Sequence, residues 1–167
     1  MNNVLLLSEK TLKQDSLIND NVDTMYIVPA IQVAQEQALQ QLIGTCLYDK
    51  ICALVASGTI PTDYKLLLDN YIIPFLEYKV MSDIQIPLSY KFRNLGMNQT
   101  IDERTLTPSL RDTQYLIEYY DNKAKFFGDR LYDYLCANCK LFPEFRKKDS
   151  CDDLMANKMS YKTNLVL

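Results

Sequence analysis

Residues 64–80 read YKLLLDNYIIPFLEYKV, and their apolar side chains recur at intervals of three and four residues. This is the period of an amphipathic helix and not the alternation of a strand. The apolar positions of this run and of a second run further along are Leu68, Ile72, Phe75 and Leu76, then Leu116, Tyr119, Tyr120, Phe127, Leu131 and Tyr134. The two runs predict two long, tyrosine-rich helices on either side of an irregular polar segment, residues 89–107. We interpret their apolar faces as surfaces for assembly with other chains.

Shorter helices are predicted before this pair. An extended arm leads into a short helix over residues 9–14. A second helix runs to Ile43 and ends at Gly44, and Pro29 fits it only near the first turn, because deeper in a helix proline removes a backbone hydrogen bond. Thr45 is expected to cap a third helix over residues 46–56. The face that the second helix buries is predicted to consist of Ile27, Ile31, Ala34, Ala38 and Leu42.

The two long helices have predicted boundaries as well. Thr62 is expected to cap the first, which bends at Pro74 and carries on toward Ile86. The second begins near Ser109 and runs to about Asn138. Between them the sequence alternates and contains Gly96, a pattern typical of a hairpin or ordered loop.

The fold class that follows is all-α: a bundle of about four helices with a projecting hairpin or loop and extended terminal arms. Residues 1–20 are predicted to form the N-terminal arm and residues 21–141 the helical core. The projecting loop within the core covers residues 88–107, and residues 142–167 form an irregular C-terminal arm.

Composition narrows the classes of function. The chain has 167 residues, 48% of them hydrophobic, and a net charge of -3, so it can bury the core of one ordinary domain. General nucleic-acid binders obtain much of their affinity from surplus Lys and Arg, which this chain lacks. No apolar run approaches the roughly 20 residues needed to cross a bilayer, and residues 1–20 do not read as a secretory signal. We expect synthesis in the cytoplasm and no membrane partner.

The residue types needed for most enzyme chemistry are scarce. The chain contains no histidine, which removes the commonest general base and the commonest metal ligand. Its four glycines are isolated from one another, so no glycine-rich loop is present to cradle a phosphate. We therefore predict a protein that is not an enzyme and has no cofactor.

The cysteines leave one alternative open. Cys136 and Cys139 have the spacing of a metal knuckle or a dithiol pair, but a structural zinc needs four ligands. Cys151 offers a third thiolate, and a fourth would have to come from distant Cys46 or Cys52. We expect five reduced, structural thiols and no metal site, and we keep a metal-dependent or redox protein as a competing hypothesis.

Candidate partner-binding residues come from the aromatic and basic side chains. Twelve tyrosines and no tryptophan suit interfaces, because tyrosine offers a large rigid face with one hydroxyl. Tyr90 and Phe92 lie outside any predicted helix, which favours a role in an interface. The sequence does not decide between a place in the core and a place in a subunit interface for Tyr71, Tyr78, Tyr119 and Tyr120. A basic cluster that either contacts an acidic partner or is simply solvated consists of Arg146, Lys147 and Lys148.

Several strings in the same order resemble one known family across nearly the whole chain. They are VLLLSEKTLK (4–13), NDNVDTMYIVPAIQVAQEQ (19–37), LIGTCLYDKI (42–51), YKLLLDNYIIPFLEYKV (64–80), SYKFRNLGMNQT (89–100) and RLYDYLCANCKLFPEF (130–145). In order and spacing they resemble the small helical head-tail connector, or adaptor ring, proteins of tailed bacteriophages. The resemblance is to the type found in crAss-like and other Bacteroidetes phages.

The resemblance implies a ring, commonly a dodecamer, located beneath the portal of the filled capsid. DNA passes through its centre without sequence-specific binding, to which a negatively charged protein is suited. The projecting loop and the chain termini would contact neighbouring subunits, the portal and the adjacent tail ring proteins. The resemblance assigns these contacts to the segments 90–100 and 161–167, and the residues concerned are Tyr90, Phe92, Arg93, Met97, Asn98 and Gln99, then Tyr161, Leu165, Val166 and Leu167.

The sequence therefore leads to one hypothesis and one principal alternative. The hypothesis is a virion structural protein, made in the host cytoplasm, that seals the DNA-filled head and provides a platform for tail attachment. The alternative is a small cytosolic helical interaction module that regulates a partner enzyme through the segment 90–100.

Overall fold

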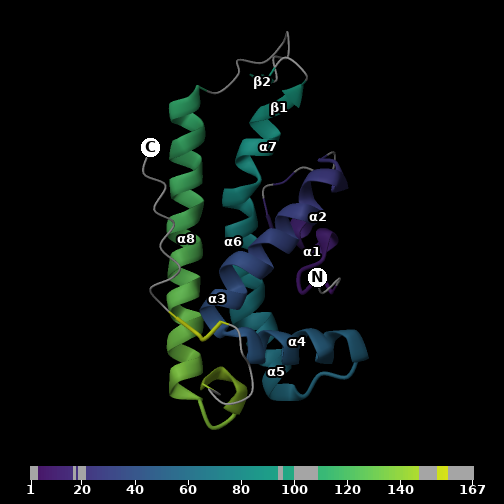
Figure 1. Ribbon diagram of the computed structural model, residues 1–167, viewed down its shortest axis with the longest axis vertical. Coiled ribbons are helices and arrows are strands. Elements are labelled where there is room, and N and C mark those ends of the chain that lie inside the picture. The colour runs from purple at the N-terminus through teal and green to yellow at the C-terminus, as the bar shows by residue number, and fades with distance from the viewer. Residues whose placement is uncertain are drawn as a thin grey trace.

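The computed structural model describes residues 4–16, 18, 22–93, 96–99, 109–146 and 154–157. The fold is all-α, as predicted, with one short two-stranded hairpin. In Figure 1 the helix α6 runs through the middle of the molecule, with α8 along one side and α1 and α2 on the other. The helix α4 lies across one end, beside α5, and the hairpin lies beyond α7 at the other.

The N-terminal segment folds much as the sequence predicts. Ser8 is the N-cap of α1 (Glu9–Asp15), and its hydroxyl accepts a hydrogen bond from the Thr11 amide at 3.0 Å. Asp23 caps α2 (Thr24–Val33) by accepting from the Met25 amide at 3.2 Å. The predicted face of this helix is confirmed, since all five of its residues are buried: Ile27, Ile31, Ala34, Ala38 and Leu42.

Pro29 is deeper in α2 than predicted. The helix begins at Thr24, so Pro29 is its sixth residue and stands past the first turn. Proline has no backbone N–H to donate to the preceding turn of the helix. The loss of this hydrogen bond destabilises the helix little, because Pro29 is on the exposed side, where water can bond the carbonyl instead.

The same helix then widens into the π-helical segment η1 (Ala34–Leu39) before α3 (Gln40–Ile43). The Gln40 amide donates to the carbonyl of Gln35, five residues back instead of four. One extra residue per turn enlarges the inward face, so Gln35 is buried beside Ala34, Ala38 and Leu39. The sequence pattern, which assumes a regular helix, did not predict this segment.

Gly44 separates α3 from α4 (Thr45–Ser57) and has a positive φ of 82°. Thr45 is the first residue of α4 and not its cap, contrary to the prediction. Its hydroxyl accepts hydrogen bonds from the Gln40 side-chain amide at 3.0 Å and from the Leu154 amide at 3.2 Å. At the other end Gly58 closes α4 in the left-handed conformation, as predicted.

The long predicted helix around residues 64–80 is one continuous but uneven rod. It consists of α5 (Thr62–Leu67), the π-helical segment η2 (Leu68–Ile72) and α6 (Ile73–Asp83). Pro61, not Thr62, is the N-cap residue. Pro74 is the second residue of α6, in the first turn, where its missing amide matters least because the preceding Ile73 amide already bonds five residues back to Leu68.

The C-terminal half completes the fold. After α7 (Gln85–Ser89), the strands β1 (Tyr90–Arg93) and β2 (Gly96–Gln99) form an antiparallel hairpin in which Phe92 pairs with Met97. The prediction for this segment was a hairpin or an ordered loop, and over residues 90–93 and 96–99 the structure has the hairpin. Residues 88 and 89, which were included in the predicted loop, belong to α7. The helix α8 (Leu110–Ala137) packs along α6 and α7, and a short 3₁₀ helix, η3 (Pro143–Arg146), follows it.

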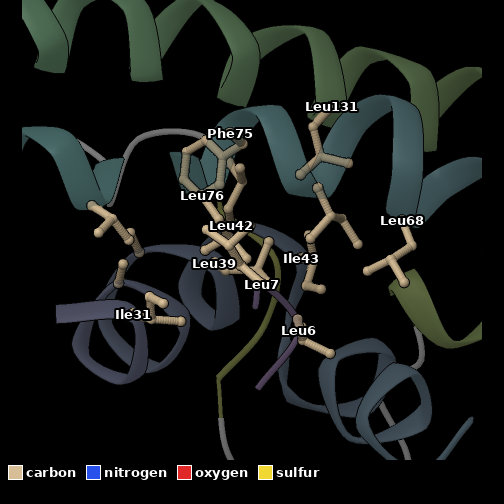
Figure 2. Packing of buried hydrophobic residues seen from close by; sticks show 14 of the residues in the cluster. Leu6, Leu7, Ile31, Leu39, Leu42, Ile43, Leu68, Phe75, Leu76 and Leu131 are labelled. Atoms are coloured by element: carbon tan, nitrogen blue, oxygen red, sulfur yellow. The ribbon is translucent and has the colours of Figure 1, made fainter. Parts of the chain in front are cut away.

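One hydrophobic core joins these elements. Figure 2 shows Leu6 and Leu7 of the N-terminal arm in the same cluster as Phe75 and Leu76 of α6 and Leu131 of α8. Phe142 and Phe145, from the C-terminal segment, are buried in it as well. The residues assigned to the two arms thus supply part of the core.

A short C-terminal strap, Leu154–Asn157, closes over the break between α3 and α4. The Thr45 amide donates to the Leu154 carbonyl at 3.0 Å, and the Asn157 amide donates to the Gln41 carbonyl at 3.1 Å. A Cβ atom on Gly44 would lie 3.0 Å from the Ala156 nitrogen. Glycine is therefore required here for its positive φ and for the close approach of the strap.

Candidate functional site: two apolar stripes

The helix α8 starts at a well-formed cap. The Asp112 amide donates to the Ser109 hydroxyl at 3.2 Å, and the Ser109 amide donates to the Asp112 carboxylate at 3.0 Å. This capping box satisfies two amides that the helix itself leaves free. The Ser109 hydroxyl, which donates to the Asp112 carboxylate at 2.7 Å, and the Ser109 amide hold the pKa of Asp112 below its ordinary value. The helix has 28 residues, about 42 Å at 1.5 Å per residue, which makes it long enough to form one side of the molecule.

The side of α8 that faces away from the core carries large aromatic residues. Tyr115 is 69% exposed, Tyr119 46% and Phe126 64%. Their spacing of four and seven residues places them along one line of the helix, roughly opposite the buried residues Ala124 and Leu131. We call these three residues the α8 stripe. Phenylalanine and tyrosine this exposed in one line are typical of protein interaction surfaces.

A lysine connects the α8 stripe with α6. The Lys123 ammonium lies 4.4 Å from the ring centre of Tyr119 and 5.3 Å from that of Tyr78. Contact with Tyr119 raises the pKa of Lys123, and both contacts are favourable cation–π interactions. Lys123 therefore restricts the Tyr119 ring at the surface, which lowers the entropy lost when a partner packs on it.

A second apolar line runs along α2. Met25, Pro29 and Val33 are exposed and are spaced by four residues, roughly opposite the buried Ile27 and Ile31. We call them the α2 stripe. Because α6 lies between α2 and α8 (Figure 1), the two stripes are on opposite sides of the molecule.

The surroundings of the two stripes differ in charge. From Asp23 to Ile43 the only charged residues are Asp23 and Glu36, both acidic. From Asn122 to Arg130, around Phe126, three basic residues stand against one acidic residue: Lys123, Lys125 and Arg130 against Asp129. The α2 side is thus negative and the middle of the α8 side positive, so the two sides complement each other.

The predicted tyrosines divide between core and surface. Tyr71 stacks on Tyr134 with ring centres 4.1 Å apart, and Tyr78 stacks on Phe127 at 5.1 Å, both across the contact between α8 and the rod of α5 to α6. Tyr120 is buried. Of the four residues for which core and interface were both open, only Tyr119 is mainly at the surface.

The sequence-predicted partner residues lie elsewhere. Tyr90, Phe92 and Arg93 are in β1, whereas Met97, Asn98 and Gln99 are in β2 directly opposite. The hairpin brings these six positions together at the end of the molecule beyond α7 (Figure 1). Arg146 is the last residue of η3. The remaining predicted residues lie outside the described part of the chain: Lys147, Lys148, Tyr161, Leu165, Val166 and Leu167.

Sequence reasoning missed Tyr115, Phe126 and the whole α2 stripe. The signal was present in the spacing of Tyr115, Tyr119 and Phe126, which follow a line of their own on the helix. The apolar run predicted for this helix combines Leu116 and Tyr119 with Tyr120 and Leu131, whose side chains face the core, and so it does not separate the exposed line from the buried face. Both Leu116 and Tyr119 are in fact exposed, at 39% and 46%.

The cysteines correct one expectation. Cys52, Cys136 and Cys139 are not disulfide-bonded, as predicted. Cys46 is disulfide-bonded, so the prediction of five reduced thiols is wrong for this residue, because sequence spacing does not show which cysteines the fold brings together. Within the described residues, no three potential metal ligands of the His, Cys, Asp or Glu type form a cluster.

Glu77 on α6 makes stability depend on pH. Burial, with a contribution from the negative charge of Asp15, raises the pKa of Glu77 to about 7. The folded chain therefore holds this proton more tightly than the unfolded chain, and stability falls as the pH rises from about 4.5 through 7. We expect Glu77→Gln to raise the free energy of unfolding by about 1–2 kcal/mol at pH 8, allowing for partial solvent screening, and to change it little at pH 4.

Urea denaturation of both chains at pH 4 and pH 8 checks this expectation. The exposed carboxylate of Glu118 on α8 provides a matched control, since Glu118→Gln should change stability by less than about 0.5 kcal/mol at either pH. An equal gain for Glu77→Gln at both pH values would contradict the assigned shift.

The fold and its two stripes define an all-α protein whose candidate site is an extended surface. Residues 39–154 match the family of unknown function DUF6712. The match covers more than half of the chain, and the protein belongs to this family. No curated protein and no solved structure matches it.

The described ranges contain one weak candidate for a membrane-crossing segment. No single helix there is both long and apolar enough to span a bilayer. The helix α4 and the rod Thr62–Ser89 meet the requirement of length and composition only together, across a bend of 107°.

Proposed function

We propose that the protein is a virion structural subunit that forms an oligomeric ring between the portal and the tail of a bacteriophage. The observation that supports this best is the pair of exposed apolar stripes on opposite sides of one chain. A surface that binds a different surface on the next copy generates a head-to-tail series, and such a series closes into a ring when the rotation between copies permits it. One chain then needs two unlike contact surfaces on opposite sides, as α8 and α2 are.

The composition of the stripes favours contact between copies. In this proposal Phe126 and the two tyrosines of the α8 stripe provide the large anchors that carry most of the binding energy of interfaces. The aliphatic α2 stripe provides the surface on which they pack. The charges around the two stripes add orientation, because basic residues near Phe126 face Asp23 and Glu36 of the neighbouring copy.

The remaining contacts follow from the ends of the molecule. The hairpin of β1 and β2 lies beyond α7, away from the middle of both lateral surfaces, and in the proposed ring it contacts the portal or the next tail ring protein. The net charge of -3 suits a ring through which DNA slides without specific binding. The ring seals the filled head and offers the tail a platform, and no catalytic step is part of the proposal.

Mass measurement of the purified chain, during size-exclusion chromatography, tests the proposal. The wild-type protein should form a closed oligomer at high concentration, whereas Phe126→Asp and Val33→Asp should each prevent it. Leu110→Asp is the matched control, because Leu110 is 60% exposed on the same helix but away from the α8 stripe. This variant should still assemble.

Mixing the two disruptive variants tests the head-to-tail arrangement. Phe126→Asp retains an intact α2 stripe and Val33→Asp an intact α8 stripe, so the mixture should give a one-to-one dimer and nothing larger. A wild-type chain that stays monomeric up to its solubility limit would oppose the ring and favour a small interaction module. Dimers formed by Val33→Asp alone would indicate that α8 contacts α8, and the head-to-tail model would be wrong.

A further inference from the structure

Two backbone groups of the N-terminal arm are hydrogen-bonded to one buried side chain. The Gln35 oxygen Oε1 accepts a hydrogen bond from the Leu6 amide at 2.8 Å, and its nitrogen Nε2 donates to the Val4 carbonyl at 3.1 Å. Gln35 itself is only 1% exposed. The arm precedes α1 and belongs to no helix or strand.

The side-chain amide of Gln35 acts as a strand partner. It presents one N–H and one C=O group to residues two apart in the arm, as a single residue of a neighbouring parallel β-strand does with its own backbone N–H and C=O. Contacts of this kind recognise an extended backbone whatever its sequence, and side-chain pockets then supply the specificity. If the arm left, Gln35 would be buried with only the Tyr48 hydroxyl, 3.5 Å from Nε2, as a remaining contact.

The arm residues beside Gln35 are aliphatic. Leu7 is fully buried and Leu6 is 6% exposed, and both belong to the main core. Val4 and Leu5 are partly buried against it. The site therefore fits a short aliphatic peptide, and we call it the Gln35 slot.

The π-helical segment η1 builds this slot. Ile31, Gln35 and Leu39 follow one another at intervals of four, so a polar side chain stands in the middle of an apolar face. In η1 the widened turn buries Ala34, Gln35, Ala38 and Leu39 together. Such π-helical insertions occur often at functional sites, and here the insertion provides the width in which a glutamine lies among core residues.

We propose that the Gln35 slot binds the arm of a second copy of this chain, in exchange for the chain's own arm. Every contact that the slot makes with Val4–Leu7 is available to the same segment of another copy, so exchange loses no interaction energy. The eight residues between α1 and α2, SLINDNVD, span up to about 28 Å when extended. The proposal goes beyond the ring, because the slot and the two stripes have no residue in common.

Crosslinking in the full-length chain tests the exchange. The photoreactive residue p-benzoylphenylalanine replaces Leu5, and equal amounts of unlabelled and ¹⁵N-labelled protein are unfolded, refolded together and irradiated. Mass spectrometry of the digested products then identifies adducts between residues near position 5 and the segment around Gln35. We expect at least a third of these adducts to join a labelled with an unlabelled peptide, as random exchange predicts one half.

Variants of Gln35 and Leu7 test whether the mixed adducts depend on the Gln35 slot. Gln35→Leu keeps the size of the side chain but removes both hydrogen bonds, and it should lower the yield of mixed adducts at least fivefold. Leu7→Asp, which cannot dock its arm, and Gln35→Glu, which cannot donate to the Val4 carbonyl, should each melt at a lower temperature than the wild type. An equal mixture of the two should show a transition above that of either variant, because the intact arm of one enters the intact slot of the other.

The outcomes separate this proposal from the ring. In the Phe126→Asp background the ring is lost, yet mixed adducts should persist at high protein concentration. Adducts that join only peptides with the same label, in both backgrounds, would overturn the exchange and leave the arm as a part of its own chain's core. This readout does not depend on whether the Leu7 or Gln35 variants fold.

Discussion

Replacing Lys79 with alanine is expected to lower the free energy of unfolding by about 3–5 kcal/mol at pH 7. The Lys79 ammonium lies 2.9 Å from the Asp83 carboxylate on the same helix and 3.3 Å from the Asp121 carboxylate on α8. Only 10% of the lysine side chain is exposed, against 28% for each aspartate. Removing the cation leaves two partly buried negative charges without the group that neutralises them.

The pKa values show how the burial and the charges compete. Burial alone would lower the pKa of Lys79, but the two aspartates outweigh it and the pKa lies above its ordinary value. Burial raises the pKa of Asp83, and Lys79 offsets only a part of this. Without Lys79 the carboxylate should hold its proton even more tightly, so the loss of stability should be smaller at pH 4 than at pH 7.

Chemical denaturation of wild type and Lys79→Ala at both pH values measures this effect. Lys65 on α5 is exposed, and Lys65→Ala serves as the control with an expected change below about 0.5 kcal/mol. A third chain, Lys79→Met with Asp83→Asn and Asp121→Asn, removes all three charges together and should recover most of the loss. If Lys79→Ala cost no more than Lys65→Ala, the cluster would contribute nothing to the packing of α8 on α6.

The sequence predicted those parts of the fold that depend on local pattern. The buried face from Ile27 to Leu42, the glycine ends at Gly44 and Gly58, and the span of α8 all follow from periodicity and capping, which act over a few residues. Leu68, Ile72, Phe75 and Leu76 are buried for the same reason. The two π-helical segments were missed because each inserts one residue into a pattern that assumes a constant period.

Contacts between segments far apart in the chain could not be predicted from the local sequence pattern. Gln35 reads as an exception within an apolar face, and only the arm 29 residues earlier, whose Leu6 amide it accepts, explains why it is buried. Lys79 reads as an ordinary solvated lysine beside Asp83, and its burial depends on Asp121, 42 positions away. In both cases a polar residue is satisfied by a partner that no local pattern identifies.

The structure adds residues to the candidate site that the sequence prediction did not include. The expectation of a tyrosine-rich interaction surface stays a prediction, and the structure offers Tyr115, Tyr119 and Phe126 of α8 as the residues for it. The sequence favours the hairpin positions because aromatic residues outside predicted helices have no helical face to bury them and so suit an interface. Exposed aromatics within a helix look in sequence like core residues, since the period alone does not say which side of the helix faces the protein.

A close contact between α8 and α6 leads to the second large effect, at Gly128. A Cβ atom on this residue would lie 3.0 Å from the Phe75 ring carbon Cε2 and 3.5 Å from the Leu42 methyl carbon Cδ2. The ring is fully buried and has no free space into which to move, since protein cores are close-packed. Gly128→Val is therefore expected to cost about 3 kcal/mol, because overpacking outweighs the gain in helix propensity.

A double-mutant cycle identifies the cause. Phe75→Leu shortens the side chain on α6 and should by itself cost about 1–2 kcal/mol. In the Phe75→Leu background, Gly128→Val should cost at least 1 kcal/mol less than in the wild type, because the two residues compete for the same volume. Simple additivity of the two changes, measured by urea denaturation, would show that Gly128 is required for a reason other than the Phe75 ring. Gly128→Ala should stay close to the wild type, since a gain of about 1 kcal/mol in helix propensity offsets a milder clash.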